Sequence, residues 1–346
     1  TRFKCDWSSD VCSSDLVWVV PLHADPTNQP PPPTWVQFFT EWKWDWLFVV
    51  PASLGFGLYL WGVWRLRARG DRWPAVRTWS WCVGGIGTAV VAGVSVLGAY
   101  DTVLFSVHMV QHMMLTMITP VFLAIGAPIT LLLRNLGAAG RRRVTRALHS
   151  WPMRVLLFPP LSTALLITTP FALYLTELYP FTLRVAWAHD LLHIYMVTVG
   201  CLFFFPMLGN DPMPNRLPYP MRMLLLFITM PAQAFLGTTI MGSSRLIAEE
   251  WYVSFNRAWP PSPIDDQYYA GAIMWATGDL TMGIIMTVFL AQWYADSRRE
   301  AAREDRRLDR EERLAAQRAA AGAAGGNHYD DGTGGRGAAP PEKEDE

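Results

Sequence analysis

Long apolar segments separated by short polar connectors dominate this chain. Each segment is close to the roughly 20 residues that a helix needs to cross the hydrocarbon core of a bilayer. The segments fall at about 46–64, 79–99, 103–133, 153–176, 185–208, 221–243 and 268–293. The pattern predicts an all-α, polytopic membrane protein with seven transmembrane helices.

The third apolar segment is longer than one span requires. It contains Pro120 and, further along, the tripeptide Gly126–Ala127–Pro128. Proline within a helix removes a backbone hydrogen bond and clashes with the preceding turn. We therefore expect this helix to bend or to end early, with its remainder near the membrane interface.

Arginine is concentrated in alternate connectors. Short loops rich in arginine stay on the cytoplasmic side of a membrane. The connectors after the first, third and fifth segments, and the start of the C-terminal tail, contain Arg65, Arg67, Arg69, Arg72, Arg77, Arg134, Arg141, Arg142, Arg143, Arg146, Arg154, Arg216, Arg222, Arg298, Arg299 and Arg303. An odd number of spans places the two termini on opposite sides, so we predict the N-terminus outside and the C-terminus in the cytoplasm.

The two ends of the chain differ from its centre. The first sixteen residues, TRFKCDWSSDVCSSDL, are polar and resemble translated sequencing-adapter text, and a proline-rich linker follows. We predict a non-native or disordered segment at 1–34, a membrane domain at 35–294, and a charged cytoplasmic helix with a disordered tail at 295–346.

Composition narrows the class of protein further. Hydrophobic residues make up 51% of the chain and charged residues only 17%, below the quarter or so typical of soluble domains. The formal net charge of zero gives no indication of a nucleic-acid partner. Lysine is absent from all seven apolar segments, which excludes a retinal Schiff base.

Two histidine pairs interrupt the apolar pattern. The stretch HMVQHMMLTM has His108 and His112 one helical turn apart, and HDLLH has His189 and His193 at the same spacing. From the expected outer ends of their helices, the first pair lies roughly 7 and 13 Å deep and the second roughly 6 and 12 Å. Buried histidines can simply join helices by hydrogen bonds. Matching depth in two pairs favours a metal or cofactor site instead, provided that the two helices are neighbours.

The methionines near these histidines bear on the choice of metal. Imidazole suits zinc, copper, iron or nickel, whereas a thioether favours Cu(I). Met109 and Met113 lie beside the first pair as accessory candidates. Any one methionine is well explained as core packing. Copper is favoured only by the methionines near the histidines taken together.

The histidine pairs are also compatible in principle with other chemistries. Neither pair has the HExxH pattern, which disfavours a zinc protease. Paired histidines can also bind haem axially, but irons one helical turn apart, about 6 Å, are too close for two macrocycles. One haem between the two helices remains an alternative, although it leaves two histidines unexplained.

One carboxyl group falls near the middle of the seventh segment. Asp279 has no basic residue obviously opposite it. An acid at this depth is costly unless it is neutral, hydrated or paired. Two roles for Asp279 stay open. It is either a protonated acid bonded to a neighbouring helix or a relay for protons or cations below the histidines.

Three stretches of the chain resemble a known family. They are HMVQHMMLTMITPVFLAIGAPITLLLR from His108, HDLLHIYMVTVGCLFFFPMLG from His189, and SPIDDQYYAGAIMWATGDL from Ser262. Together they resemble the CtaG family of seven-helix proteins required for assembly of caa3-type cytochrome c oxidase. The resemblance runs from about Trp35 to Tyr294.

The resemblance implies a non-enzymatic assembly factor, multi-pass in a bacterial plasma membrane, with cytochrome c oxidase subunits as partners. It implies help with copper delivery or insertion at the outer face, with the family's histidines at His108, His112, His189 and His193. A haem-binding electron carrier is the second hypothesis. A copper or proton transporter, in which Asp279 would matter most, is the third.

Overall fold

The computed structural model describes residues 31–34, 36–40, 42–209, 211–215 and 217–326. The sixteen N-terminal residues predicted to be non-native lie outside these ranges, as do residues 327–346 of the predicted tail. The described part of the chain is helical and contains no strand, which confirms the all-α prediction. Its shorter helices are α1 (Gln37–Thr40), α9 (Ala138–Leu148), α10 (Trp151–Leu156) and α15 (Glu249–Ser254).

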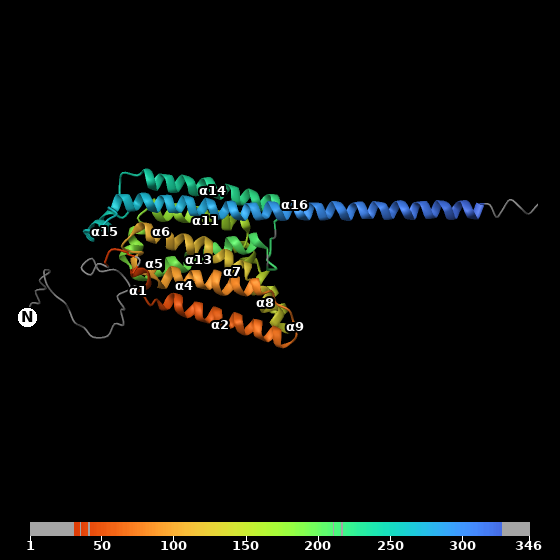
Figure 1. Ribbon diagram of the computed structural model, residues 1–346, viewed down its shortest axis with the longest axis horizontal. Coiled ribbons are helices and arrows are strands. Elements are labelled where there is room, and N and C mark those ends of the chain that lie inside the picture. The colour runs from red at the N-terminus through yellow and green to blue at the C-terminus, as the bar shows by residue number, and fades with distance from the viewer. Residues whose placement is uncertain (1–30, 35, 41, 210, 216, 327–346) are drawn as a thin grey trace, which may run out of the picture. The chain divides into compact units, whose positions relative to one another are not determined.

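Six helical stretches are long and apolar enough to cross a membrane (Figure 1). Two of them contain short interruptions and π-helical turns. They are α2 (Trp46–Ala68); α3 (Ala75–Trp79) with η1 (Ser80–Gly87), α4 (Thr88–Val94) and α5 (Val96–Tyr100); α6 (Phe105–Met113) with η2 (Met114–Ile118), α7 (Thr119–Ile125) and α8 (Pro128–Asn135); α13 (Ala186–Leu208); α14 (Tyr219–Gly242); and the first part of α16 (Pro263–Gly326).

The span predicted at 153–176 is a broken helix. Residues 153–176 include α11 (Pro159–Tyr174), which is followed by α12 (Leu178–Arg184) at an angle of 71°. Pro159 begins α11 because proline is favoured in the first turn of a helix, where its missing N–H costs nothing. Counted as one broken span, α11 and α12 bring the total to the predicted seven.

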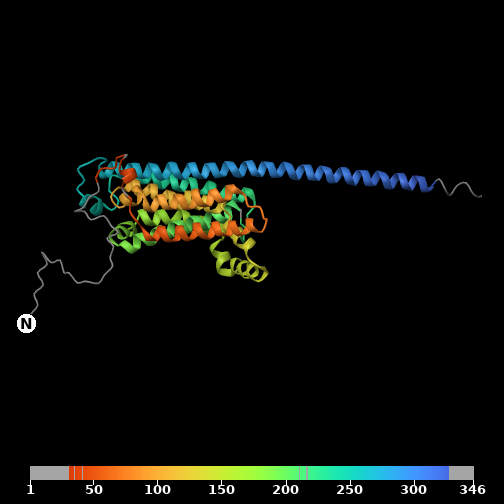
Figure 2. The same ribbon diagram turned by 60° about the horizontal axis from the view of Figure 1, so that its bottom comes forward.

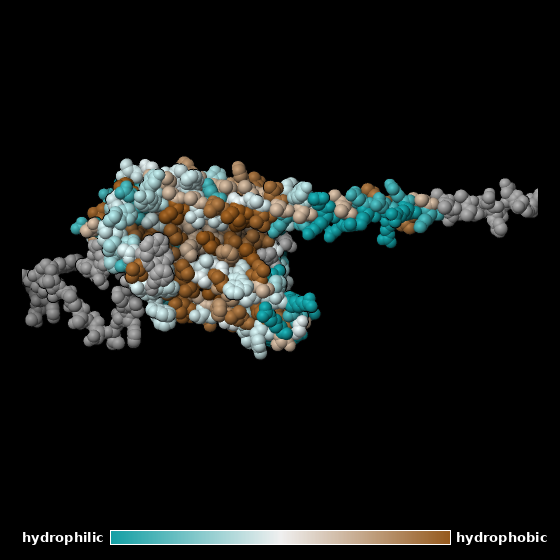
Figure 3. Space-filling view, viewed as in Figure 1, coloured by the Kyte–Doolittle hydropathy of each residue, from teal (hydrophilic) through white to brown (hydrophobic). Residues whose placement is uncertain are grey.

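The surface of the bundle is apolar in its middle. Figure 3 shows hydrophobic side chains gathered across the helices on one face, with hydrophilic residues towards the helix ends. In water such exposure would be costly, whereas lipid accepts apolar side chains and requires backbone polar groups to be bonded internally. Large exposed apolar side chains include Leu54, Leu58, Trp61, Phe227 and Leu280. The protein is therefore a multi-pass membrane protein.

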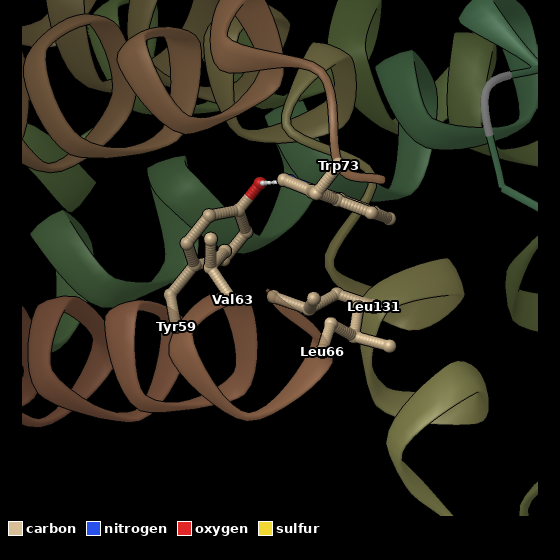
Figure 4. Packing of buried hydrophobic residues seen from close by; sticks show 5 residues of the cluster. All are labelled: Tyr59, Val63, Leu66, Trp73 and Leu131. Atoms are coloured by element: carbon tan, nitrogen blue, oxygen red, sulfur yellow. Dashed lines mark hydrogen bonds between the residues drawn. The ribbon is translucent and has the colours of Figure 1, made fainter. Parts of the chain in front are cut away.

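The tripeptide Gly126–Ala127–Pro128 ends α7, as expected. Ala127 adopts a left-handed conformation with φ 50°, and α8 begins at the proline. The hydroxyl of Tyr59 in α2 donates a hydrogen bond to the Gly126 carbonyl at 2.7 Å. The same tyrosine accepts one from the Trp73 indole at 3.3 Å, over a small core completed by Val63, Leu66 and Leu131 (Figure 4).

A carboxylate from a distant connector caps α8. Asp211, which follows α13, accepts hydrogen bonds from the backbone N–H of Thr130 at 2.7 Å and of Ile129 at 3.3 Å. Helix N-termini leave such N–H groups without intrahelical partners. The break in the third span is therefore satisfied by a group that only the tertiary fold brings there.

The basic connectors contact one another. The Arg134 guanidinium donates to the Arg72 carbonyl at 3.3 Å, and Asn215 donates to the Arg154 carbonyl at 2.7 Å. Figure 2 shows α9 and α10, in yellow, at the edge of the bundle near these contacts. The connectors after the first, third and fifth spans thus share one end of the bundle; the assignment of that end to the cytoplasm stays a prediction.

The third and fifth spans are direct neighbours, which the predicted histidine site required. Figure 1 shows α13 running beside α6 and α7. A methyl group on Gly200 of α13 would lie 2.2 Å from the Thr116 carbonyl oxygen and 2.5 Å from Cγ of Pro120. Only glycine allows this approach, because no side chain separates the two backbones.

The helix α16 continues through the predicted domain boundary at 294/295. It runs without a break to Gly326. The chain divides into compact units at Thr1–Thr287 and Val288–Glu346. Residues 290–318 of this helix are exposed, and they carry ion pairs among themselves, such as that of Arg307 with Glu311 at 3.0 Å.

Gly200→Ala is expected to destabilise the protein by about 1–3 kcal/mol, because an added methyl group meets backbone that cannot move aside. The measurement is thermal unfolding in detergent micelles, followed by tryptophan fluorescence. Gly57→Ala in α2 is the matched control, since a Cβ there meets nothing within 4 Å. Equal melting temperatures for the two variants would show that the close contact of α13 with the third span at Gly200 does not limit the packing of these helices.

Candidate metal centre

The four predicted histidines form one buried cluster between α6 and α13. His108 is fully buried, and the other three are no more than 3% exposed. His108 and His189 are the fourth residues of their helices, so at 1.5 Å per residue the pairs lie at the same depths, about 5 and 11 Å from the helix starts. Equal depth and neighbouring helices bring the pairs together.

The imidazole rings contact one another around a closed circuit. Ring centroids are 3.8 Å apart for His108 and His112, and 4.6 Å apart for His189 and His193. Between the helices, the centroid distances are 5.5 Å for His108 with His189 and 6.0 Å for His112 with His193. The four rings therefore form one cluster with members from both helices.

A buried carboxylate joins the cluster from the turn before α6. Oδ2 of Asp101 lies 3.1 Å from Nε2 of His189 and 3.9 Å from Nε2 of His193. One ligand atom from each of these three residues lies within 4.8 Å of the other two, which is close enough for one metal ion. Asp101 is not among the site residues predicted from the sequence; its position directly before the first histidine helix is the signal that could have indicated it.

The charge of Asp101 suits a cation. Burial alone raises the pKa of this carboxyl group, because it disfavours the charged form. The hydrogen bond with His189 and the nearby basic groups outweigh burial and hold its pKa below the usual range. Asp101 is therefore ionised at neutral pH and is the anionic member of the cluster.

Two neutral groups orient the deeper histidines. The Gln111 amide donates to the Ala92 carbonyl at 3.0 Å, so its oxygen faces Nε2 of His193 at 3.1 Å. Tyr174 of α11 hydrogen-bonds Nδ1 of His112 at 2.9 Å, and its hydroxyl also donates to the sulfur of Met109 at 3.9 Å. Bonds of this kind fix which ring nitrogen carries the proton and which presents its lone pair.

Several ring nitrogens have no partner among the described residues. They are Nδ1 and Nε2 of His108, Nε2 of His112 and Nδ1 of His193, and all are buried. A buried polar atom without a hydrogen bond costs roughly 1–3 kcal/mol. Neutral imidazole nitrogens are good metal ligands. Among the described residues, the group whose ligand atoms lie close enough together for one ion is Asp101 with His189 and His193, and the rings of His108 and His112 lie beside it.

Aromatic rings close the cluster off from its surroundings. The His108 ring lies 4.7 Å from the Tyr179 ring and 6.1 Å from that of Phe105. The hydroxyls of Tyr179 and Tyr252 share a hydrogen bond at 2.5 Å. The low polarity of this shell strengthens electrostatic interactions inside it.

The other residues predicted for the site, Met109, Met113 and Asp279, do not all lie at the histidine cluster. Met109 and Met113 are buried on the histidine face of α6, beside Tyr174 and His112. Asp279 is half-buried on α16. Within the part of the chain that the structure describes, no hydrogen bond or ion pair joins Asp279 to the histidine cluster.

Asp266 and Gln267, in the motif that begins at Ser262, hold the surroundings of the histidine helix α6 in place. Asp266 of α16 accepts hydrogen bonds from the backbone N–H of Phe105 at 2.7 Å and of Ser106 at 3.2 Å, at the start of α6. The Gln267 oxygen accepts from the backbone N–H of Ile247 at 2.7 Å and ties the loop after α14 to α16. These residues hold the fold around the cluster and do not touch its rings.

The fold and this site define a polytopic helical membrane protein with a buried histidine–carboxylate cluster shared by two spans. The model of the family described as cytochrome c oxidase caa3 assembly factor (Caa3_CtaG) matches residues 57–296. The chain belongs to this family. The resemblance inferred from the three motifs is therefore confirmed.

Curated relatives are similar over most of the chain. Uncharacterized protein ML1998 of Mycobacterium leprae (strain TN) is 38% identical over 288 residues, which cover 81% of this chain and 43% of the relative. Uncharacterized protein Mb0105 of Mycobacterium bovis is 37% identical with the same coverage. The chain thus matches less than half the length of these relatives. No solved structure matches it.

Asp266→Ala is expected to loosen the start of α6, because it removes the acceptor of two helix N-terminal N–H groups. A lost cap costs about 1 kcal/mol, so hydrogen exchange at Phe105 and Ser106 should quicken roughly fivefold. Mass spectrometry of peptides from 100–110 gives the measurement. Asp265→Ala is the control, since its carboxylate accepts only locally, from Ser262 at 2.6 Å; equal exchange in both variants would contradict the capping role.

Proposed function

We propose that this protein assists cytochrome c oxidase assembly by holding a copper ion in the histidine cluster and releasing it to an oxidase subunit. The observation that carries the proposal is the closed circuit of four buried imidazoles, in which ring nitrogens of His108, His112 and His193 have no hydrogen-bond partner among the described residues. Copper is here a cargo, and the protein performs no catalysis. Membership of the family supports the oxidase as the recipient.

The ligand set favours copper among the metals that imidazole accepts. Zinc, copper, iron and nickel all bind imidazole, but a thioether next to the site selects Cu(I). The sulfur of Met109 is linked through Tyr174 to His112, so a soft ligand lies within one side chain of the cluster. Delivery then requires only that a recipient's ligands replace the imidazoles one at a time.

Packing favours copper over haem. A haem held between α6 and α13 needs a flat slot for its macrocycle between two axial histidines. Imidazole and tyrosine rings fill this space, with His108 only 5.5 Å from His189 and 4.7 Å from Tyr179. A single ion needs no such slot.

The position of the cluster indicates where release would occur. It lies within about 11 Å of the end of the bundle opposite to the arginine-rich connectors. With those connectors in the cytoplasm, the cluster is near the outer surface of a bacterial plasma membrane. Copper held there could pass to an oxidase domain outside the cell without crossing the bilayer.

Replacing His108 and His112 together by alanine is expected to abolish stoichiometric copper binding under reducing conditions and to lower oxidase activity in membranes. Added copper should restore part of that activity, because excess metal bypasses a delivery factor. Metal analysis of the purified protein and oxygen uptake are the measurements. His149→Ala is the control, at an exposed histidine outside the cluster whose ring bonds the Thr145 carbonyl; normal oxidase activity in the double variant would exclude His108 and His112 from the mechanism.

Topology fusions test the orientation. A fluorescent protein fused after Gly70 should fluoresce, and alkaline phosphatase fused there should be inactive, because that connector is predicted to be cytoplasmic. Fused after Ser244, alkaline phosphatase should be active and the fluorescent protein dark. The opposite pattern at both positions would place the cluster near the cytoplasm and would contradict delivery at the outer face.

A further inference from the structure

A small cavity lies directly below the histidine cluster. Its volume is about 30 Å³, and helices α6, η2, α11, α13, α14 and α16 enclose it. A space of this size holds a water molecule or a single ion. Six of its lining side chains carry potential soft or borderline metal ligands: Met109, Met113, Met117, Met196, Met274 and His112.

The concentration of methionine at this cavity is unusual. Five of the 15 methionines in the chain line it. Each of the five is at most 6% exposed. Three of them, Met109, Met113 and Met117, follow one another at intervals of four residues along α6 and η2, so they form one stripe that faces Met196 of α13 and Met274 of α16. Methionine also fills gaps in ordinary cores, because its side chain is flexible and polarisable.

Polar groups are directed at the sulfur atoms. The Thr116 hydroxyl donates to Sδ of Met196 at 3.3 Å, and the Gln233 amide nitrogen lies 4.0 Å from Sδ of Met117. Thioether sulfur is a weak hydrogen-bond acceptor. These contacts place a polar group beside the sulfurs of Met196 and Met117. Oε1 of Gln233 has no hydrogen-bond partner among the described residues.

His112 connects the cavity to the cluster. Its ring lies 3.8 Å from that of His108 and 6.0 Å from that of His193, and it also lines the cavity. Its Nε2 is buried and has no partner in the part of the chain that the structure describes. Tyr174 contacts both the histidine cluster and the methionine stripe, because its hydroxyl hydrogen-bonds Nδ1 of His112 and the sulfur of Met109.

We propose that this cavity is a second site for Cu(I), with thioether ligands from the methionine stripe and Met196, and that His112 is the ligand through which the ion moves to the histidine cluster. The proposal rests on the proposed function, because it assumes that the chain handles copper. Copper stays in the +1 state throughout. Each step exchanges one neutral ligand for another, so no electron or proton is transferred.

The test is an anaerobic Cu(I) titration of the full chain in detergent, against a chromophoric chelator, with X-ray absorption of the copper-loaded protein. We expect two bound ions for the wild type and copper–sulfur scattering in addition to copper–nitrogen scattering. The double variant Met117→Leu with Met196→Leu should bind one ion and lose most of the sulfur contribution. Leucine conserves the volume of methionine, so this variant is expected to fold.

Matched variants distinguish failure of the second copper site from failure of the proposed function. Met114→Leu with Met241→Leu, at half-buried methionines outside the cavity lining, should keep two ions. His189→Ala with His193→Ala should keep the sulfur-bound ion alone. Copper bound only by nitrogen in the wild type, or two ions in the Met117/Met196 variant, would overturn the second site and leave the proposed function standing. No copper in any variant would overturn both.

Discussion

The contact of α13 with the third span at Gly200 is the constraint on which the site depends. Backbone meets backbone there, because a single methyl group would lie 2.2 Å from the Thr116 carbonyl. Two turns before this glycine on α13 lies His193, and one turn before Thr116 lies His112. Close approach at the glycine therefore forces the deeper histidines of the two helices against each other, and the shallower pair follows.

Burial in a membrane decides how the polar groups of this fold are used. Backbone N–H groups at the starts of α6 and α8 have no partners within their own helices, and a carboxylate from another part of the chain accepts hydrogen bonds from them in each case. The cluster follows the same rule only in part, because ring nitrogens of His108, His112 and His193 have no hydrogen-bond partner among the described residues. This contrast between satisfied structural groups and unsatisfied imidazoles separates the framework from the candidate site.

The chemistry of the site agrees with the proposal of a copper ion that is held and then released. One carboxylate and neutral rings would balance the proposed copper ion without an excess of negative charge. Soft sulfur lies deeper and borderline nitrogen lies nearer the helix ends, so the proposed ion would meet harder ligands as it moved outward. A permanently bound cofactor would be expected to have a closed, fully satisfied ligand set instead.

The sequence by itself determined the spans, their helical class and the equal depth of the two histidine pairs, because hydropathy and helical periodicity are local properties. The family could also be recognised from the motifs around His108, His189 and Ser262. Sequence could not show that Asp101, Gln111 and Tyr174 complete the cluster, that Asp266 caps α6, or that α11 bends into α12. Each of these depends on which helices are neighbours, and that is set by packing between residues distant in the chain.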